Sequence, residues 1–151
     1  MGDIVHVSGL CGPRNPGGHG GWGFSLRDEH GTRILEQSGR VQPEVLITNN
    51  TMEFVAVGKA IQAYIESGRP GPLLIRSSSD LVVNTLRGVW APRKGAYVAM
   101  CRSVQTLMTT TTVELAFEHV RGEQNLWVQD MAQSALREIG IVPFNHRDCG
   151  V

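Results

Sequence analysis

The sequence predicts an α/β fold, a single domain in which helices pack on a mixed five-stranded sheet. Three strand-like segments come first, and helical and strand-like segments alternate after them. That order is typical of a sheet covered by helices. The 151 residues contain no repeat, low-complexity tract or linker. We therefore expect residues 1–151 to fold as one domain.

Three strands are expected before the first helix. Residues 3–8, 22–27 and 33–41 alternate in polarity or run apolar, with many β-favouring side chains. A Gly- and Pro-rich turn separates the first two strands, and the turn DEHG at 28–31 separates the second from the third. These connections predict an antiparallel meander.

The first helix is predicted from apolar spacing. Phe54, Val57 and Ile61 recur at steps of three and four, so that they line one face of a helix over 51–67. Asn50 and Glu53 have the spacing of an N-cap and its reciprocal glutamate. The later elements are expected as a strand at 72–77, helices at 80–90 and 97–108, a strand at 112–120 and a helix at 126–139.

Composition excludes several kinds of partner. The 14 Lys and Arg residues balance 14 Asp and Glu residues, so nucleic-acid binding requires a local patch. No apolar run approaches the roughly 18 residues that cross a bilayer, so we expect no membrane contact. Cys11, Cys101 and Cys149 lack the spacing of a zinc or redox motif. We expect unpaired, partly buried thiols in a cytoplasmic protein.

Four segments contain the polar residues that can carry chemistry. They are SGLCGPRNPGGHGGWG at 8–23, TNNTMEF at 48–54, SSSDLVVN at 77–84 and GEQNLWVQDMA at 122–132. In order and spacing they resemble the motifs of ribonuclease H type 1, over nearly the whole chain. The resemblance implies the ribonuclease H-like fold. In that family, four carboxylates hold two magnesium ions and the enzyme cuts the RNA strand of an RNA/DNA hybrid.

The resemblance places the four carboxylate positions on residues of which two are neutral. The family motifs D-G-S-C, TNNxMEL, S-D-S-x-Y-V and D-x-L-A put them on Ser8, Glu53, Ser78 and Asp130. Glu53 and Asp130 are therefore the candidate metal ligands. A neutral hydroxyl is a poor ligand for a strongly hydrated dication, so Mg²⁺ or Mn²⁺ is expected to bind weakly at best. Glu123 stands where the family has a histidine.

The nucleic-acid-binding positions, in contrast, keep the residue types of the family. The resemblance implies contacts with RNA 2′-hydroxyls and base edges, and with one phosphate of the DNA strand. The residues that match the 2′-hydroxyl and base-edge contacts are Cys11, Asn15, Asn49 and Asn50. Thr48 matches the residue that contacts the DNA phosphate. The segment WAPRKGAY at 90–97 replaces a basic protrusion of the family. It either contacts a nucleic-acid backbone or forms an ordinary solvated turn.

Two further residues lie two positions along the chain from Ser8 and Ser78, the neutral residues at carboxylate positions. Asp80 is expected in the first turn of a helix, where its charge complements the helix dipole. His6 shares a strand face with Ser8 and is expected to be a hydrogen-bonded core residue.

Three functions are compatible with these residues. The leading hypothesis is a catalytically degenerate ribonuclease H-like protein, a pseudoenzyme that binds an RNA/DNA hybrid or structured RNA without efficient cleavage. The second is an active endonuclease with an altered metal site built from Glu53, Asp130 and either Asp80 or His6. The third is a scaffold whose groove has become the contact surface for a protein partner.

Overall fold

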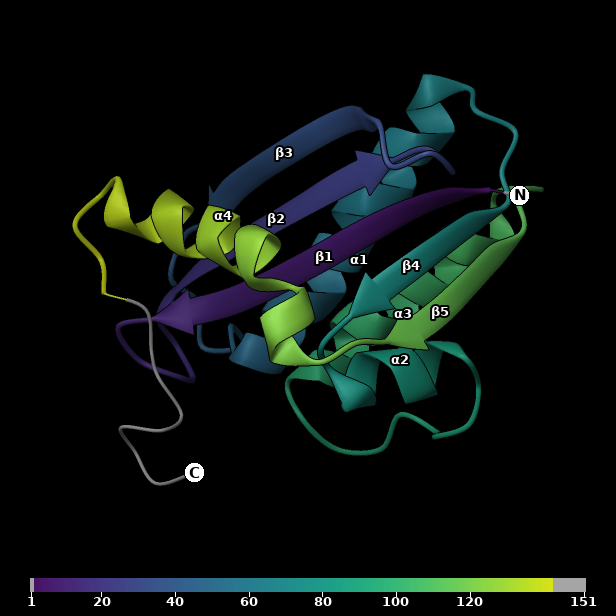
Figure 1. Ribbon diagram of the computed structural model, residues 1–151. Helices are drawn as coiled ribbons and strands as arrows, with labels where there is room; N and C mark the ends of the chain where they lie inside the picture. Colours follow the sequence, from purple (N-terminus) through teal and green to yellow (C-terminus); the bar gives the residue numbers. More distant parts are fainter. Residues whose placement is uncertain (1, 143–151) are drawn as a thin grey trace.

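The computed structural model describes residues 2–142, which form a five-stranded sheet with the order β3-β2-β1-β4-β5 (Figure 1). The antiparallel meander is confirmed, and β4 and β5 continue the sheet with parallel pairing. The strands are β1 (Asp3–Gly12), β2 (His19–Arg27), β3 (Arg33–Val41), β4 (Leu73–Ser77) and β5 (Leu115–His119).

Helices cover both faces of the sheet. α1 contacts β1, β2 and α3 on one face, whereas α4 contacts β1, β2 and β3 on the other (Figure 1). The helices are α1 (Asn49–Ser67), α2 (Asp80–Leu86), α3 (Tyr97–Thr109) and α4 (Leu126–Arg137), with a 3₁₀ turn η1 (Gly122–Gln124). The predicted element order is confirmed. Within the described residues, no helix is long and apolar enough to span a membrane.

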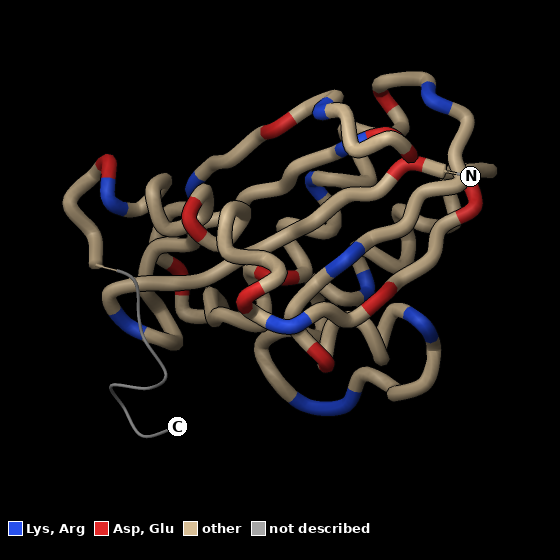
Figure 2. The backbone as a smooth tube through the Cα atoms, viewed as in Figure 1, with Lys and Arg blue, Asp and Glu red and all other residues tan. Residues whose placement is uncertain are grey.

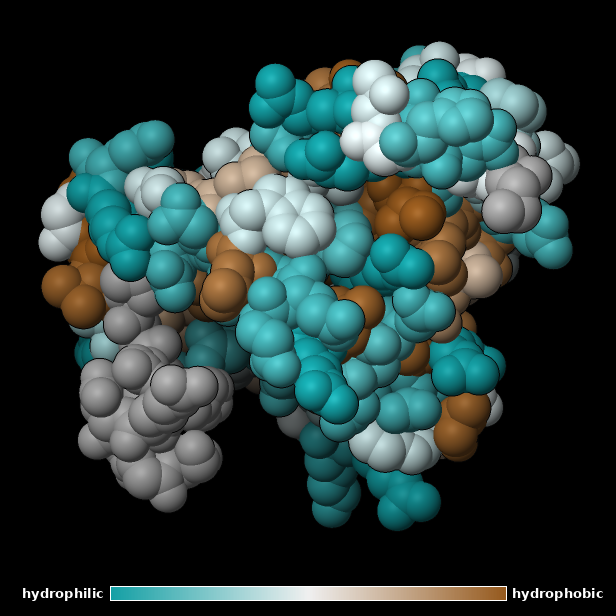
Figure 3. Space-filling view, viewed as in Figure 1, coloured by the Kyte–Doolittle hydropathy of each residue, from teal (hydrophilic) through white to brown (hydrophobic). Residues whose placement is uncertain are grey.

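The two faces of β1 have different roles. Val5 and Val7 are buried in the core beneath α1. The alternate residues Ile4, His6 and Ser8 belong to the opposite face, because successive strand residues point to opposite sides. Apolar surface remains visible over β1 and β4 on that side (Figure 3). The sheet therefore has a packed face and a partly open face.

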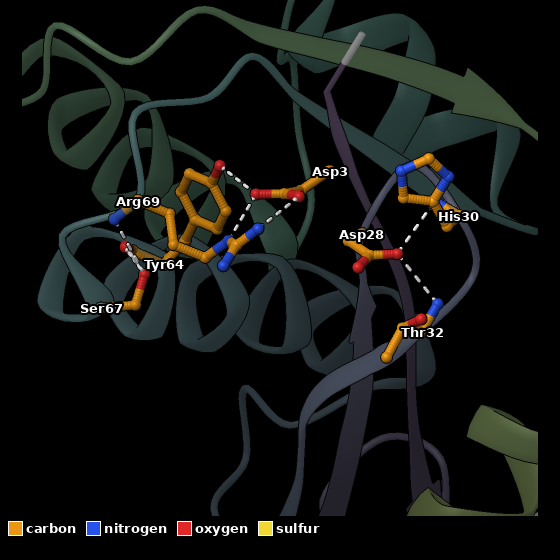
Figure 4. A network of polar contacts seen from close by, with 7 residues as sticks. All are labelled: Asp3, Asp28, His30, Thr32, Tyr64, Ser67 and Arg69. Carbon is orange, nitrogen blue, oxygen red and sulfur yellow. Dashed lines mark hydrogen bonds and ion pairs between the residues drawn. The ribbon is translucent and has the colours of Figure 1, made fainter.

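A buried carboxylate fixes the start of β1 to the end of α1. Asp3 accepts a hydrogen bond of 2.6 Å from the Tyr64 hydroxyl and bonds of 2.7 and 3.0 Å from Arg69 (Figure 4). The hydrogen bond from Arg69 lowers the pKa of Asp3. In the same view, Asp28 accepts hydrogen bonds from the backbone N–H groups of His30, in the predicted DEHG turn, and of Thr32, which follows it.

The first helix begins two residues earlier than predicted. Thr48 is its N-cap, and the Thr48 hydroxyl accepts a 2.9 Å hydrogen bond from the Thr51 N–H. The prediction that Asn50 caps the helix with Glu53 as its reciprocal partner is therefore wrong. Both Asn49 and Asn50 belong to the first turn.

The two thiols within the described residues, Cys11 and Cys101, are free, as predicted, and they are fully buried where partial burial was expected. Cys149 lies outside the described residues.

Candidate functional site

Glu53 lies where α1 crosses β1 and is only 9% exposed. Its Oε1 accepts a 3.0 Å hydrogen bond from the Gly9 N–H, and its Oε2 accepts a 3.2 Å bond from the Ser77 hydroxyl. A Cβ on Gly9 would collide with the backbone of Met52, so glycine at this position permits the close approach of α1. Burial raises the pKa of Glu53 to about 7, although both hydrogen bonds act in the opposite direction.

The two serines at carboxylate positions lie on β1 and just after β4. Ser8 is buried on β1 next to Gly9, and Ser78 directly follows β4, with its carbonyl oxygen 3.3 Å from His119 Nε2. The serine that bonds to Glu53 is Ser77, a residue that the motif comparison did not select. The alternation of Leu73, Ile75 and Ser77 along β4 was a signal for it, since all three are buried on one side.

Asp130 does not lie in this cluster. Its side chain is 69% exposed on α4 and forms a 3.4 Å ion pair with Arg137, two helical turns along. In the D-x-L-A motif the alanine stands three residues after the acid, and Ala132, which is fully buried, stands only two residues after Asp130. Counting three residues back from Ala132 gives Gln129. We therefore correct the fourth position from Asp130 to Gln129.

The position of Gln129 in the helix agrees with this correction. Gln129 is one turn after Asn125, which is buried against β1, and its amide donates a 3.2 Å hydrogen bond to the Gly122 carbonyl. Three of the four carboxylate positions are then neutral.

The residues present do not fit a pair of magnesium ions. The carboxylate of Glu53 is already hydrogen-bonded through both oxygens, and Asp130 pairs with Arg137. Among the described residues, no group of three or more His, Cys, Asp or Glu side chains is arranged to hold a metal ion. Such a site needs several anionic oxygens to bind hard cations.

The two further residues have other partners. His6 Nδ1 lies 2.9 Å from Asn125 Oδ1, which confirms the predicted hydrogen-bonded core histidine, and burial lowers its pKa. The His6 ring also packs 4.5 Å from the Trp127 ring. Asp80 is the first residue of α2, as predicted, and its carboxylate lies 3.5 Å from His119 Nε2.

In contrast to the carboxylate positions, the predicted binding residues meet in one pocket of about 370 Å³. The turn after β1, the first turn of α1 and the start of α3 form its walls. Four of the five predicted binding residues line it, together with part of the 90–97 segment. The lining residues are Asn15, Pro16, Thr48, Asn49, Asn50, Lys94, Gly95, Ala96 and Tyr97.

Hydrogen bonds fix the amide side chains of this pocket. Asn15 Oδ1 accepts a 3.2 Å bond from the Asn49 N–H, and Asn49 Oδ1 accepts a 2.8 Å bond from the Cys11 N–H. The Cys11 thiol itself is fully buried and donates to the Arg14 carbonyl, and burial raises its pKa to about 11. Cys11 therefore supports the pocket through its backbone N–H, and a contact of Cys11 with nucleic acid stays a prediction.

Positive charge gathers beside the pocket although the chain is neutral overall. The loop between α2 and α3 contains Arg87, Arg93 and Lys94 and no acidic residue (Figure 2). The loop is thus a local basic patch in a chain of balanced composition.

Comparison with solved structures defines the class of this fold. LC11-RNase H1, solved in complex with an RNA/DNA hybrid, superposes with a TM-score of 0.80 at 22% identity, over 91% of this chain and 98% of that chain. RNase H1 from Halobacterium salinarum NRC-1 superposes with a TM-score of 0.78 at 22% identity, over 90% and 98% of the two chains. The fold is that of the type 1 ribonucleases H.

The family follows from the sequence match. A family model described as reverse transcriptase-like matches residues 12–135, and the chain belongs to that family. A ribonuclease H of Jannaschia sp. (strain CCS1) is 37% identical over 85 residues, which are 56% of this chain and 51% of that protein. The match thus spans about half of the relative. The resemblance to ribonuclease H type 1 is confirmed.

Proposed function

We propose that this protein binds RNA/DNA hybrids, or structured RNA of the same A-like form, without cleaving them efficiently. The observation that carries the proposal is the 370 Å³ pocket, in which Asn15, Thr48, Asn49 and Asn50 converge with Lys94. A neighbour in fold, LC11-RNase H1, was solved with an RNA/DNA hybrid.

The chemistry of the pocket suits an A-like duplex. Amide and hydroxyl groups donate to and accept from ribose 2′-hydroxyls and base edges, which are displayed in the shallow minor groove of such duplexes. Lys94 adds a charge that attracts a backbone phosphate. Recognition of this kind needs few net charges, in agreement with the neutral chain.

The same structure argues against efficient cleavage. Hydrolysis by two metal ions requires anionic ligands that hold both cations about 4 Å apart. Ser8, Ser78 and Gln129 provide no charge, and the buried Glu53 carboxyl has a pKa of about 7. We infer that this site provides too little negative charge to stabilise the transition state of phosphodiester hydrolysis.

Binding is tested by fluorescence anisotropy with a labelled hybrid in the presence of EDTA. Asn50→Ala and Lys94→Ala should each weaken binding about fivefold, equivalent to about 1 kcal/mol. Lys94→Ala should also reduce the slope of the logarithm of the binding constant against the logarithm of the salt concentration by about 1, because one phosphate contact is lost. Gln62→Ala is the matched control, because its amide lies on the exposed side of α1 and bonds to Glu66. Absence of hybrid binding even at low salt would contradict the proposal and favour the protein scaffold.

Cleavage is tested separately with the same hybrid in Mg²⁺ and in Mn²⁺. The expected result is intact RNA under conditions in which an ordinary ribonuclease H degrades it. Turnover comparable to that enzyme would overturn the degenerate assignment and favour the altered metal site.

A further inference from the structure

We propose that a second pocket, next to the first, accepts an unpaired nucleobase that flanks the bound duplex. This inference rests on the proposed function and refines its substrate class to a hybrid with a single-stranded nucleotide at a junction or end. The second pocket has a volume of about 320 Å³. It is lined by Leu81, Val89, Trp90, Ala91, Arg93 and Tyr97.

The walls of the second pocket are held in place by the fold. The Tyr97 ring stacks on the buried Phe54 ring, with centroids 5.7 Å apart and planes 11° apart. The N–H groups of Val89 and Trp90 donate hydrogen bonds of 2.9 and 3.1 Å to the Asn84 carbonyl at the end of α2. A pocket that exists before binding loses little entropy when it is filled.

The lining has the chemistry of a base-stacking site. The Trp90 residue is 47% exposed and Val89 is 62% exposed, so apolar and aromatic surface faces solvent here. Arg93 is the charged residue of the lining, and no acidic residue occurs between Leu81 and Tyr97. Aromatic rings and an arginine suit the flat face of a base and its attached phosphate.

Continuity between the pockets identifies which base is involved. Tyr97 lines both pockets, so a nucleotide in the second lies next to the polar pocket with Lys94. Bases inside a duplex are paired and stacked and do not reach a lateral pocket without flipping. A volume of about 320 Å³ is at the low end for ligand pockets, which favours one base over a duplex end.

The experiment compares three hybrids of equal duplex length. One is blunt, one has a short single-stranded DNA extension that begins with 2-aminopurine, and one has an abasic extension of the same length, with 3′ and 5′ extensions tested in turn. One polarity of the base-bearing extension should bind about tenfold more tightly than the blunt hybrid, as expected for one stacked base. Its fluorescence should fall on binding. The abasic extension should not give this gain.

Variants of Trp90 test whether the gain in affinity for the base-bearing extension depends on this ring. Trp90→Ala should remove the gain, so that this variant binds the extended and the blunt hybrid equally, and Trp90→Tyr should keep most of the gain. Ile139→Ala is the control, since it also removes an exposed apolar side chain, beyond the end of α4. Equal binding of blunt and extended hybrids would overturn the inference and leave the proposed function intact. Failure to bind any hybrid would overturn both.

Discussion

Glu53 is a structural residue in this fold as well as the carboxylate that retains its family position. Its two oxygens connect Gly9 of β1 to Ser77 of β4, which are neighbouring strands in the sheet. A buried carboxyl that accepts two hydrogen bonds contributes to folding in a way that depends on its protonation.

Glu53→Gln should change how stability depends on pH. Because the pKa of Glu53 is raised to about 7 from its ordinary value of 4.5, the folded state binds this proton more tightly than the unfolded state. The contribution to stability is therefore complete below pH 4.5 and is lost as the pH rises through 7, a change on the order of 3 kcal/mol. Glu53→Gln should abolish this loss. Urea unfolding of both proteins at pH 5 and pH 8 measures it.

The difference between the two proteins isolates Glu53. His6 has a lowered pKa, so its effect has the opposite sign, but it is present in both proteins and cancels. Equal pH dependence of the two would show that Glu53 does not have a raised pKa.

The single residues of the site were predicted unevenly. Asn15, Thr48, Asn49 and Asn50 were found because their residue types match a dense motif. Ser77 was missed because the alternation along β4 shows only that its side chain is buried, and does not show that its partner is Glu53.

At the scale of elements, Asn125 fixes α4 to the sheet. Its amide donates a 2.8 Å hydrogen bond to the Val7 carbonyl, and its Oδ1 meets His6 Nδ1. Both contacts are buried, and both join α4 to β1.

Asn125→Ala should destabilise the protein by about 3 kcal/mol, because it leaves two buried polar groups without this partner. Asn84→Ala is the matched control, since its amide bonds to the exposed Asp80 carbonyl, and it should change stability by less than about 0.5 kcal/mol. The free energies of unfolding come from urea titration. Similar small changes for both variants would mean that packing, and not this amide, holds α4.

The ends of the helices and strands could not be predicted from the periodicity of apolar residues alone. β1 runs four residues past the predicted end, because Gly9–Gly12 pair with β2 although glycine has low strand propensity. α2 ends four residues early, and Gly88 follows with a φ of +79°. In TNNT several residues are good N-caps, so only the three-dimensional structure selects Thr48.

At the scale of the whole molecule, the fold brings distant segments together at the pocket, yet separates the two remaining acids of the motifs. The predicted architecture was correct because strand and helix periods were clear along the chain. The orientation of Asp130 was not predicted correctly, because a shift of one residue along a helix rotates the side chain about the helix axis by about 100°.

Restoring the carboxylates tests this placement. Ser8→Asp with Ser78→Asp should not restore cleavage, because the position on α4 that faces the sheet is then still neutral. Adding Gln129→Asp should produce Mg²⁺-dependent cleavage of a hybrid, measured by the release of labelled RNA fragments. Cleavage by the double variant alone would show that Asp130 serves after all. A triple variant that folds, as judged by circular dichroism, but does not cleave would show that the remaining geometry is unsuited to catalysis.

The stack of Tyr97 on Phe54 couples ligand binding at the surface to the dynamics of the protein core. The wall shared by both pockets is the outer member of a pair whose inner member belongs to the hydrophobic core. A ligand that contacts Tyr97 also stabilises the packing of Tyr97 on Phe54, and therefore the packing of α3 on α1. Binding in either pocket should therefore slow amide exchange in the buried parts of these two helices.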